Sequence, residues 1–272
     1  MPYLPCNVID SYFCSVSIVE SPEYCSIIGI WREAAEGIYL SVKENVCTPG
    51  VRIGTASSAS CLCFGDICPK NTVVQAEIID VHNALRRAVQ PSASDMLRMN
   101  YSEEVAVSAQ AWVDKCILSH GAPSTRMLDG YELGENLFYS NSPKSWTDVI
   151  NAWNSEGSYF IYPNGSTNGK PVGHYTQLVW NSSYRVGCGV TLCPNDVYFY
   201  GCHYYRAGNF KGWIPYKAGP PCASCPNACE DKLCTNPCSY INRFLNCPSL
   251  VRAYGCDNHL VSGWCPASCR CP

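Results

Sequence analysis

The sequence lacks long apolar runs, basic stripes and a high density of charge. Its apolar runs are far shorter than the roughly 18 residues of a membrane-spanning helix, so the chain is not expected to span a membrane. Charged residues make up 15% of the 272, and the net charge is −3. Proteins that bind nucleic acids usually present clustered lysine and arginine. Nucleic acid is therefore not an expected partner.

An export leader is also missing from the start of the sequence. The first positively charged residue is Arg32, and no long apolar run follows Met1, whereas a signal peptide needs both features in order. We expect either that the true start lies elsewhere or that export is unconventional. Residues 1–70 are assigned no fold, and they contain seven cysteines. If the remaining cysteines pair internally, at least one thiol there is unpaired or pairs between chains.

Cysteine, by contrast, is abundant. The chain has 21, and ten of them fall in the last 51 residues. Zinc sites usually combine close cysteine pairs and leave no large surplus, so the irregular spacing favours disulfides over zinc. Disulfides indicate an oxidising, extracellular-type compartment. The candidate glycosylation sites agree with this, because three N-x-S/T sequons are present at Asn100, Asn164 and Asn181.

Apolar spacing predicts three helices followed by strands. Thr72 and Gln75 have the spacing of a capping box at the start of the first helix, and Pro91 ends its apolar run. Helices followed by an antiparallel set of strands predict an α+β fold built in layers. The second helix is expected from near Ser102 with the stripe Val105, Ala109, Trp112 and Cys116, the third from near Ser145 with the stripe Val149, Trp153, Glu156 and Phe160, and the strands at 174–180, 185–193 and 197–204.

Two histidines and two glutamates, spread over 55 residues, are candidates for one cleft. A carboxylate on an apolar stripe, such as Glu156, is costly unless it is paired or its helix frays so that it reaches water. A bridge from Cys116 to a strand cysteine would draw His120 towards the strand that carries His174. Glu135 lies in LGENLF. Imidazole and carboxylate suit zinc, or the glutamates orient the histidines. A lone histidine at the start of a strand is, however, more often structural.

Several stretches resemble a known family. GHYTQLVW at 173–180 and FYGCHYYRAGNF at 199–210 resemble the two signature motifs of the CAP superfamily, and VHNALRRAVQPSASDML at 81–97 is also similar to it. The ten tail cysteines match the spacing of the cysteine-rich domain of cysteine-rich secretory proteins. The resemblance covers about 72–272. It implies an α-β-α sandwich CAP domain at 72–215, a hinge at 216–237, and at 238–271 a small disulfide-rich helical domain similar to sea-anemone potassium-channel (ShK) toxins.

The resemblance also implies a site and a disulfide pattern. The family cleft maps onto His120, Glu135, Glu156 and His174, and the two histidines are those that bind zinc in relatives, which implies a weak zinc site here. Venom-type members bridge two further cysteines, at the positions of Leu133 and Tyr205. The implied pairs are Cys116–Cys193, Cys188–Cys202, Cys222–Cys229, Cys225–Cys234, Cys238–Cys271, Cys247–Cys265 and Cys256–Cys269.

The function that the resemblance implies is that of a secreted, non-enzymatic protein that binds or modulates ion channels or cell-surface partners, as in venom or reproductive secretions. Sterol or lipid binding is the main alternative. A metal-assisted hydrolase is a third, and no nucleophile elbow accompanies the cleft residues. Residues 238–271 contain no lysine, so plugging of a pore by a lysine is not expected, and contact would rely on an apolar surface and arginines.

Overall fold

The computed structural model describes residues 30–34, 37–41, 65–238, 240 and 242–271. The chain consists of two compact units, Met1–Ala56 and Ser57–Pro272. In the first unit, β1 (Ile30–Ala34) pairs with β2 (Gly37–Ser41) in an antiparallel hairpin. Most of the segment for which an unpaired thiol is expected lies outside the described residues. The second unit carries the features that follow.

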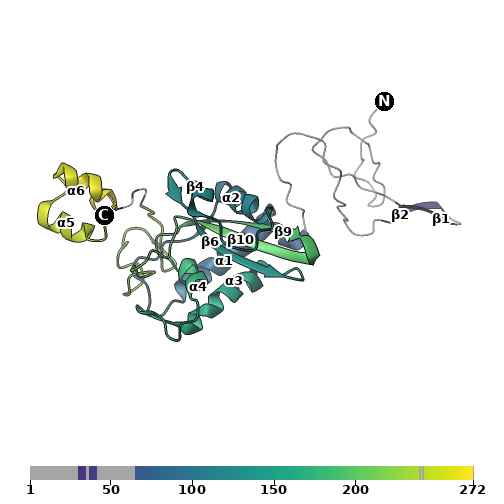
Figure 1. Ribbon diagram of the computed structural model, residues 1–272, viewed down its shortest axis with the longest axis horizontal. Coiled ribbons are helices and arrows are strands. Elements are labelled where there is room, and N and C mark those ends of the chain that lie inside the picture. Colours follow the sequence, from purple (N-terminus) through teal and green to yellow (C-terminus); the bar gives the residue numbers. More distant parts are fainter. Residues whose placement is uncertain (1–29, 35–36, 42–64, 239, 241, 272) are drawn as a thin grey trace, which may run out of the picture. The chain divides into compact units, whose positions relative to one another are not determined.

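The second unit contains the α-β-α sandwich that the family resemblance implies (Figure 1). Its sheet has the strand order β3-β9-β10-β6, with β3 parallel to β9 and the other pairs antiparallel. Helix α2 packs on β9 and β10, and α1, α3 and α4 cover the other face. The bounds are α1 Thr72–Arg87, β3 Asn100–Tyr101, α2 Glu103–Val113, β6 Gly134–Ser140, α3 Trp146–Asn154, α4 Gly173–Leu178, β9 Arg185–Cys193 and β10 Val197–Tyr205.

Short elements complete the unit. Two small hairpins lie in the CAP region, one lies in the hinge, and three helices form the C-terminal part. In the described residues, no helix combines the length and the hydropathy that a membrane span requires. The bounds are β4 Met127–Leu128, β5 Tyr131–Glu132, β7 Phe160–Ile161, β8 Gly165–Ser166, β11 Cys229–Glu230, β12 Leu233–Cys234, α5 Cys247–Tyr254, α6 His259–Trp264 and α7 Pro266–Arg270.

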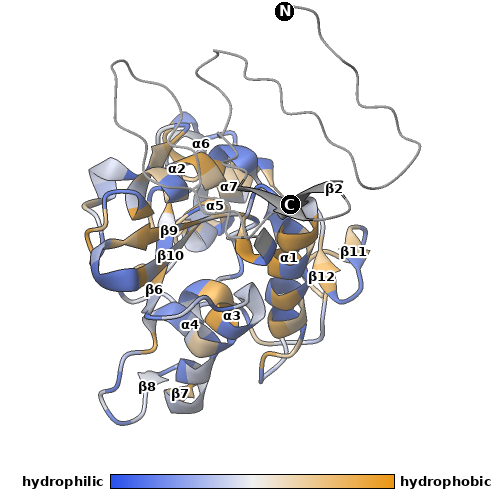
Figure 2. Ribbon diagram, turned by 90° about the vertical axis from the view of Figure 1, so that its right-hand side faces the viewer, coloured by the Kyte–Doolittle hydropathy of each residue, from blue (hydrophilic) through white to orange (hydrophobic). Residues whose placement is uncertain are grey.

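The starts of the long helices follow local capping chemistry. Helices α2 and α3 begin where predicted, and Ser102 and Ser145 cap them through their hydroxyl groups. The predicted capping box at Thr72 is wrong, because Asn71 is the N-cap and accepts a hydrogen bond from the backbone N–H of Val73. The Gln75 side chain donates instead to the carbonyl of Pro69. Figure 2 shows apolar and polar residues alternating along α1, which turns its apolar side to the core.

Helix α2 lies unusually close to β9 because glycine occupies the contact. A Cβ atom on Gly187 would stand 2.0 Å from the backbone nitrogen of Ala106, so no other residue fits without moving the helix. The helix ends at Val113, earlier than the stripe to Cys116 predicts, and Cys116 adopts a φ of 54°. This turn places Cys116 against Cys193, to which it is bonded.

Two further predictions of secondary structure are wrong. Helix α3 ends at Asn154, and the residues of its predicted last turn form a 3₁₀ turn, Ser155–Tyr159, before Phe160 begins β7. The predicted strand 174–180 is instead the short helix α4, followed by Val179 and Trp180 in a turn. Over so few residues, the apolar pattern fits a helix as well as a strand. In addition, the N–H groups of the first turn of α4 find their acceptor outside the segment.

The disulfides tie the second unit together. The described residues contain seven, and each is a pair that the resemblance implies. The hinge packs on the CAP region, where Leu233 is fully buried in the main core and Cys234 exchanges backbone hydrogen bonds with Met96 and Arg98. The C-terminal helices have a small core of their own around Cys247, Val261 and Cys265. Leu133 and Tyr205, which replace a family disulfide, pack in one apolar cluster with Val105.

A buried histidine on α1 makes the stability of the fold depend on pH. His82 is fully buried, with Nδ1 2.7 Å from the carbonyl of Ile78 and Nε2 3.1 Å from the Tyr204 hydroxyl. The carbonyl can only accept, so Nδ1 carries the proton and Nε2 accepts from Tyr204. Burial lowers the pKa of His82 to about 4, a fall that the hydrogen bond to Ile78 opposes and the charge of Arg86 reinforces.

We expect the chain to lose stability as the pH falls from 6.5 to 4. In this window the unfolded state binds a proton at residue 82 and the native state does not, so the free energy of unfolding falls by up to about 3 kcal/mol. Above pH 6.5 this contribution is fully present. Guanidinium titrations at several pH values, with disulfides intact, measure the slope. His82→Gln should reduce it, and an unchanged slope would contradict the prediction. Burial also lowers the pKa of His203, which therefore adds to the slope.

Candidate functional site

The four predicted cleft residues form two histidine–glutamate pairs. His120 Nδ1 lies 2.7 Å from Glu135 Oε1, and His174 Nδ1 lies 2.8 Å from Glu156 Oε1. The two imidazole ring centroids are 6.3 Å apart. Because an ionised carboxylate only accepts hydrogen bonds, each Nδ1 carries a proton and each Nε2 keeps its lone pair. Within the described part of the chain, neither Nε2 atom has a hydrogen-bond partner.

The pair of His174 and Glu156 explains why a carboxylate lies on the predicted apolar stripe of the third helix. Besides holding the His174 ring, Glu156 accepts hydrogen bonds at Oε2 from the backbone N–H groups of His174, at 2.8 Å, and Tyr175, at 3.3 Å. A carboxylate at this position satisfies N–H groups that the first turn of a helix leaves unpaired. Glu156 therefore fixes both the start of α4 and the orientation of its histidine. The His174 ring also stacks on Trp153 of α3, with centroids 6.4 Å apart.

Glu135 is the buried centre of the other pair. Its Oε1 accepts from His120 and from the backbone N–H of Gly121, and its Oε2 lies 3.1 Å from His203 Nε2. Burial opposes ionisation of this carboxyl, but the hydrogen bonds from the two histidines outweigh burial, and the pKa of Glu135 falls to about 2. The carboxylate is thus ionised at neutral pH. The charge of Arg126, 3.8 Å away, adds to the effect.

His203 is a site residue that the sequence analysis missed. It lies on β10 directly opposite Glu135 on β6, and its Nδ1 is 3.0 Å from the Ser108 hydroxyl on α2. Its side chain is 1% exposed, so it supports the site from within rather than facing a ligand. The sequence places His203 inside a signature stretch, but only the register of the two strands sets it against Glu135.

The cleft presents two imidazole rings to solvent. Exposed fractions of 57% for the His120 side chain and 32% for that of His174 leave both rings open to solvent. An imidazole with a free Nε2 atom and a carboxylate on Nδ1 is the kind of donor that zinc sites use, so these two residues could hold a metal ion. Both oxygens of each carboxylate already accept hydrogen bonds from the protein. Each glutamate is therefore held by the protein at both of its oxygens.

A second cluster of potential metal ligands is closed by disulfide bonds. The sulfur atoms of Cys222, Cys225 and Cys234 lie within 4.8 Å of one another. Each is oxidised, because Cys222 is bonded to Cys229 and Cys225 to Cys234. Metal binding requires thiolate, which a disulfide cannot supply. This cluster therefore holds the hinge and not a metal.

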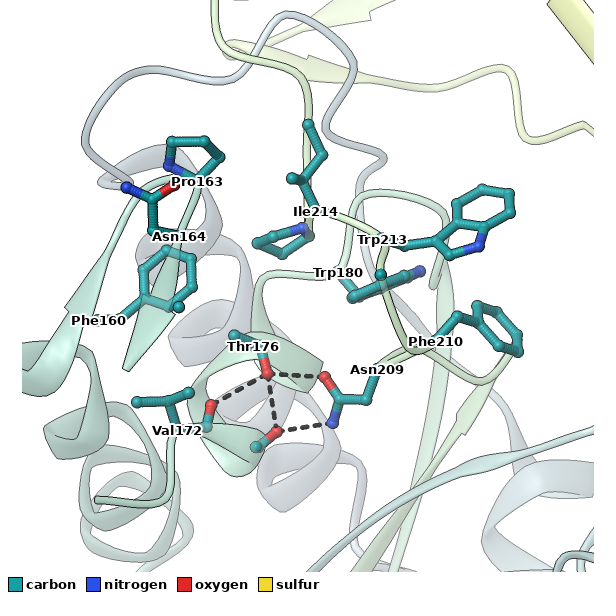
Figure 3. A pocket seen from close by; sticks show the side chains of 14 residues that line it. Phe160, Pro163, Asn164, Val172, Thr176, Trp180, Asn209, Phe210, Trp213 and Ile214 are labelled. Carbon is teal, nitrogen blue, oxygen red and sulfur yellow. Dashed lines mark hydrogen bonds between the residues drawn. The ribbon is translucent and has the colours of Figure 1, made fainter. Parts of the chain in front are cut away.

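A pocket of about 450 Å³ is lined in part by Gly173 and Thr176 of α4, the helix that carries His174. Figure 3 shows Thr176 and Asn209 hydrogen-bonded to each other at its floor. Aromatic and aliphatic side chains form the walls, and no lining residue is charged. The lining residues are Phe160, Pro163, Asn164, Gly165, Val172, Gly173, Thr176, Trp180, Asn209, Phe210, Gly212, Trp213, Ile214 and Pro215.

The three sequons have different surroundings. Asn100 and Asn164 are exposed, and Asn164 lies at the rim of the pocket. The Asn181 side chain donates to Asp95 Oδ2 at 2.6 Å, and the hydroxyl residue of its sequon, Ser183, is fully buried. A glycan on Asn181 would have to break this contact, whereas the other two positions are open.

Comparison with solved structures places the fold among known proteins. The chain is 29% identical to Na-ASP-1 with a TM-score of 0.53, and the match covers 70% of this chain but only 53% of that one. It is 30% identical to NaASP2, whose crystal structure was determined with Zn²⁺, with a TM-score of 0.53 and coverage of 62% of this chain and all of that one. BmVAL-1, at 24% identity and a TM-score of 0.52 over 62% of this chain and 98% of that one, shares the fold.

Two family models match successive parts of the sequence. The model of the cysteine-rich secretory protein family, CAP, matches residues 79–204, which include the sheet and the four cleft residues. The Crisp model matches residues 222–272, which include five of the seven disulfides. The sandwich, the disulfides and both matches agree: the chain belongs to the CAP family of cysteine-rich secretory proteins, with a C-terminal Crisp domain.

Proposed function

We propose that this chain is a secreted, non-enzymatic protein that binds an ion channel or another cell-surface partner through its C-terminal domain. The observation that carries the proposal is the apolar surface of this domain. Phe244 is 49% exposed and meets Trp264 edge to face with centroids 5.8 Å apart, and Leu245 is 60% exposed. Large apolar side chains are usually buried, and a concentration of exposed ones marks an interaction site. Further exposed apolar residues of the domain are Tyr240, Tyr254 and Leu260.

Other features of the chain support the same function. Seven disulfides suit an extracellular location. The cleft carboxylates are engaged with the protein, which argues against hydrolysis. The arginines of residues 238–271 add positive charge around the apolar surface without a lysine that could enter a pore. We infer that the domain covers a channel or receptor surface, and that the packed hinge holds it on the CAP domain.

We expect Phe244→Ser with Leu245→Ser to reduce channel block roughly tenfold or more, because the loss of two apolar contacts removes most of the binding energy of a small interface. Electrophysiology of the whole protein against a panel of channels measures this. Val107, 70% exposed on α2, provides the matched control Val107→Ser, which should leave block unchanged. Equal block by the double variant and the wild type would refute the role of this surface.

The cleft supports a second part of the proposal, that His120 and His174 bind Zn²⁺. A bound ion would supply a Lewis-acidic centre, and the two Nε2 atoms would hold it. Glu135 and Glu156 keep both rings in the tautomer that ligation requires, and His203 holds Glu135. Structural zinc sites usually have four protein ligands, so a site with two should be weak. The zinc in the NaASP2 structure is consistent with this assignment.

Sterol binding is a second candidate function, favoured by the pocket. Its volume lies in the usual range for small-molecule sites, and its lining combines apolar walls with one polar corner at Thr176 and Asn209. A neutral, mostly apolar molecule with a single hydroxyl group fits that chemistry.

We expect Val172→Trp, which fills the pocket, to weaken the binding of a fluorescent sterol roughly tenfold or more, since a pocket of this size cannot hold both. Fluorescence titration with the free protein measures the affinity. Val107→Trp adds the same side chain away from the pocket and should bind like wild type. Equal affinity of the Val172 variant would place sterol elsewhere or nowhere on the chain.

A further inference from the structure

The loop Asn209–Ile214, which follows β10, exposes an unusual amount of aromatic surface. All six of its residues are exposed. Phe210 and Trp213 are each 45% exposed, Ile214 is 44% exposed, and the Phe210 and Trp213 ring centroids lie 6.0 Å apart. Figure 3 shows the two rings together on one side of the pocket, opposite Phe160. Water contacts nearly half of each side chain, which leaves an apolar surface without a partner in the described structure.

The loop is held in this exposed form by the residues around it. The backbone N–H of Trp213 donates to the carbonyl of Phe210, closing a turn. The Asn209 amide donates to the carbonyl of Gly173 at 2.9 Å, and its oxygen accepts from Thr176 at 2.6 Å. At the other end, Tyr216 is 1% exposed in the main core. Because both ends are fixed, docking of the aromatic residues would require little ordering of the loop.

Charge around the loop favours a negatively charged surface. Lys211 lies between the two aromatic residues and is exposed. Lys170, also exposed, precedes the wall residue Val172 by two positions. Between Glu156, whose carboxylate is engaged by His174, and Glu230 the sequence contains a single carboxylate, Asp196. Asp196 lies before the start of β10, whereas the loop follows its end, so the nine-residue strand separates them by roughly 30 Å.

We propose that the loop Asn209–Ile214 docks on the surface of an anionic lipid bilayer, with Phe210 and Trp213 at the interface and Lys211 at the headgroup phosphates. Tryptophan and other aromatic residues favour the membrane–water interface, and each lysine near an anionic leaflet strengthens binding. The pocket mouth would then face the bilayer. Docking does not require an occupied pocket, so it stands or fails separately from sterol binding.

Co-sedimentation of the whole protein with phosphatidylcholine vesicles, with and without phosphatidylserine, tests the proposal. We expect binding to vesicles that contain phosphatidylserine. Phe210→Ser with Trp213→Ser should lower the partition coefficient roughly tenfold or more. Lys211→Gln should lower it about fivefold on the anionic vesicles only. Brominated lipids should quench the fluorescence of the wild type more than that of Trp213→Phe, which reports directly on the depth of this residue.

Matched variants separate docking from general stickiness. Val107→Ser and Tyr139→Ser remove side chains that are 70% and 62% exposed on α2 and β6, and they should partition like wild type. Asn164 lines the pocket and lies in a sequon, so the protein is used before and after treatment with a glycosidase, and the treated chain should bind at least as well. Absence of binding to the vesicles that contain phosphatidylserine, an unchanged partition of the loop variant, or an equal loss in the controls would overturn the proposal.

Discussion

Replacement of both His120 and His174 by alanine should abolish zinc binding. The two rings are the only donors that the proposed site offers, and each single replacement leaves one imidazole, too few to compete with water for the ion. Calorimetric titration of the wild-type chain should show one weak site. Acid should also weaken binding, because a protonated imidazole cannot ligate a metal ion. Glu135→Gln and Glu156→Gln should weaken binding roughly tenfold or more by releasing the rings.

The exposed histidine of α6 supplies the control. His259→Ala removes an imidazole that lies outside the cleft, and it should leave the calorimetric titration unchanged. Near-ultraviolet circular dichroism verifies that each variant keeps the fold. Wild-type affinity in the double histidine variant would show that the ion binds somewhere else, and the assignment of the cleft would then be wrong.

Loss of the Arg86 side chain should destabilise the CAP domain by about 4 kcal/mol or more. Arg86 is 1% exposed, and its guanidinium donates six hydrogen bonds to five backbone carbonyls. Burial lowers its pKa to about 9, so it remains mostly charged at neutral pH. Arg86→Met fills the space but leaves the carbonyls buried without a donor. The acceptors are those of Leu97, Leu178, Trp180, Asn181 and Ser183.

The neighbouring arginine distinguishes this effect from a general loss of charge. Arg87 forms an ion pair with Asp231 at 2.7 Å, and its side chain is 30% exposed, so Arg87→Met should cost less than about 1 kcal/mol. Arg86→Lys should recover only part of the loss, because an ammonium group donates at most three hydrogen bonds. Chemical denaturation with disulfides intact measures all three variants. A change within 1 kcal/mol for Arg86→Met would contradict the prediction.

Much of the fold was readable from local sequence. The hydroxyl caps at Ser102 and Ser145 act on N–H groups within their own first turns, so short-range chemistry is enough to predict where α2 and α3 begin. Strands β9 and β10 follow their predicted segments closely, because both are long and apolar. The cysteine count by itself pointed to disulfides. The individual pairs came from the family resemblance, since spacing alone leaves many pairings open.

Tertiary contacts decided the rest. The segment that begins at His174 becomes a helix because Glu156, eighteen residues earlier, caps its first turn, and no local pattern contains that contact. Glu135 meets His203 because the register of β6 and β10 places them opposite each other. The sequence by itself therefore determined which residue types are available for the cleft and which segments fold locally. Only the packing of distant segments decided which carboxylate holds which imidazole, since those hydrogen bonds join groups that are far apart along the chain.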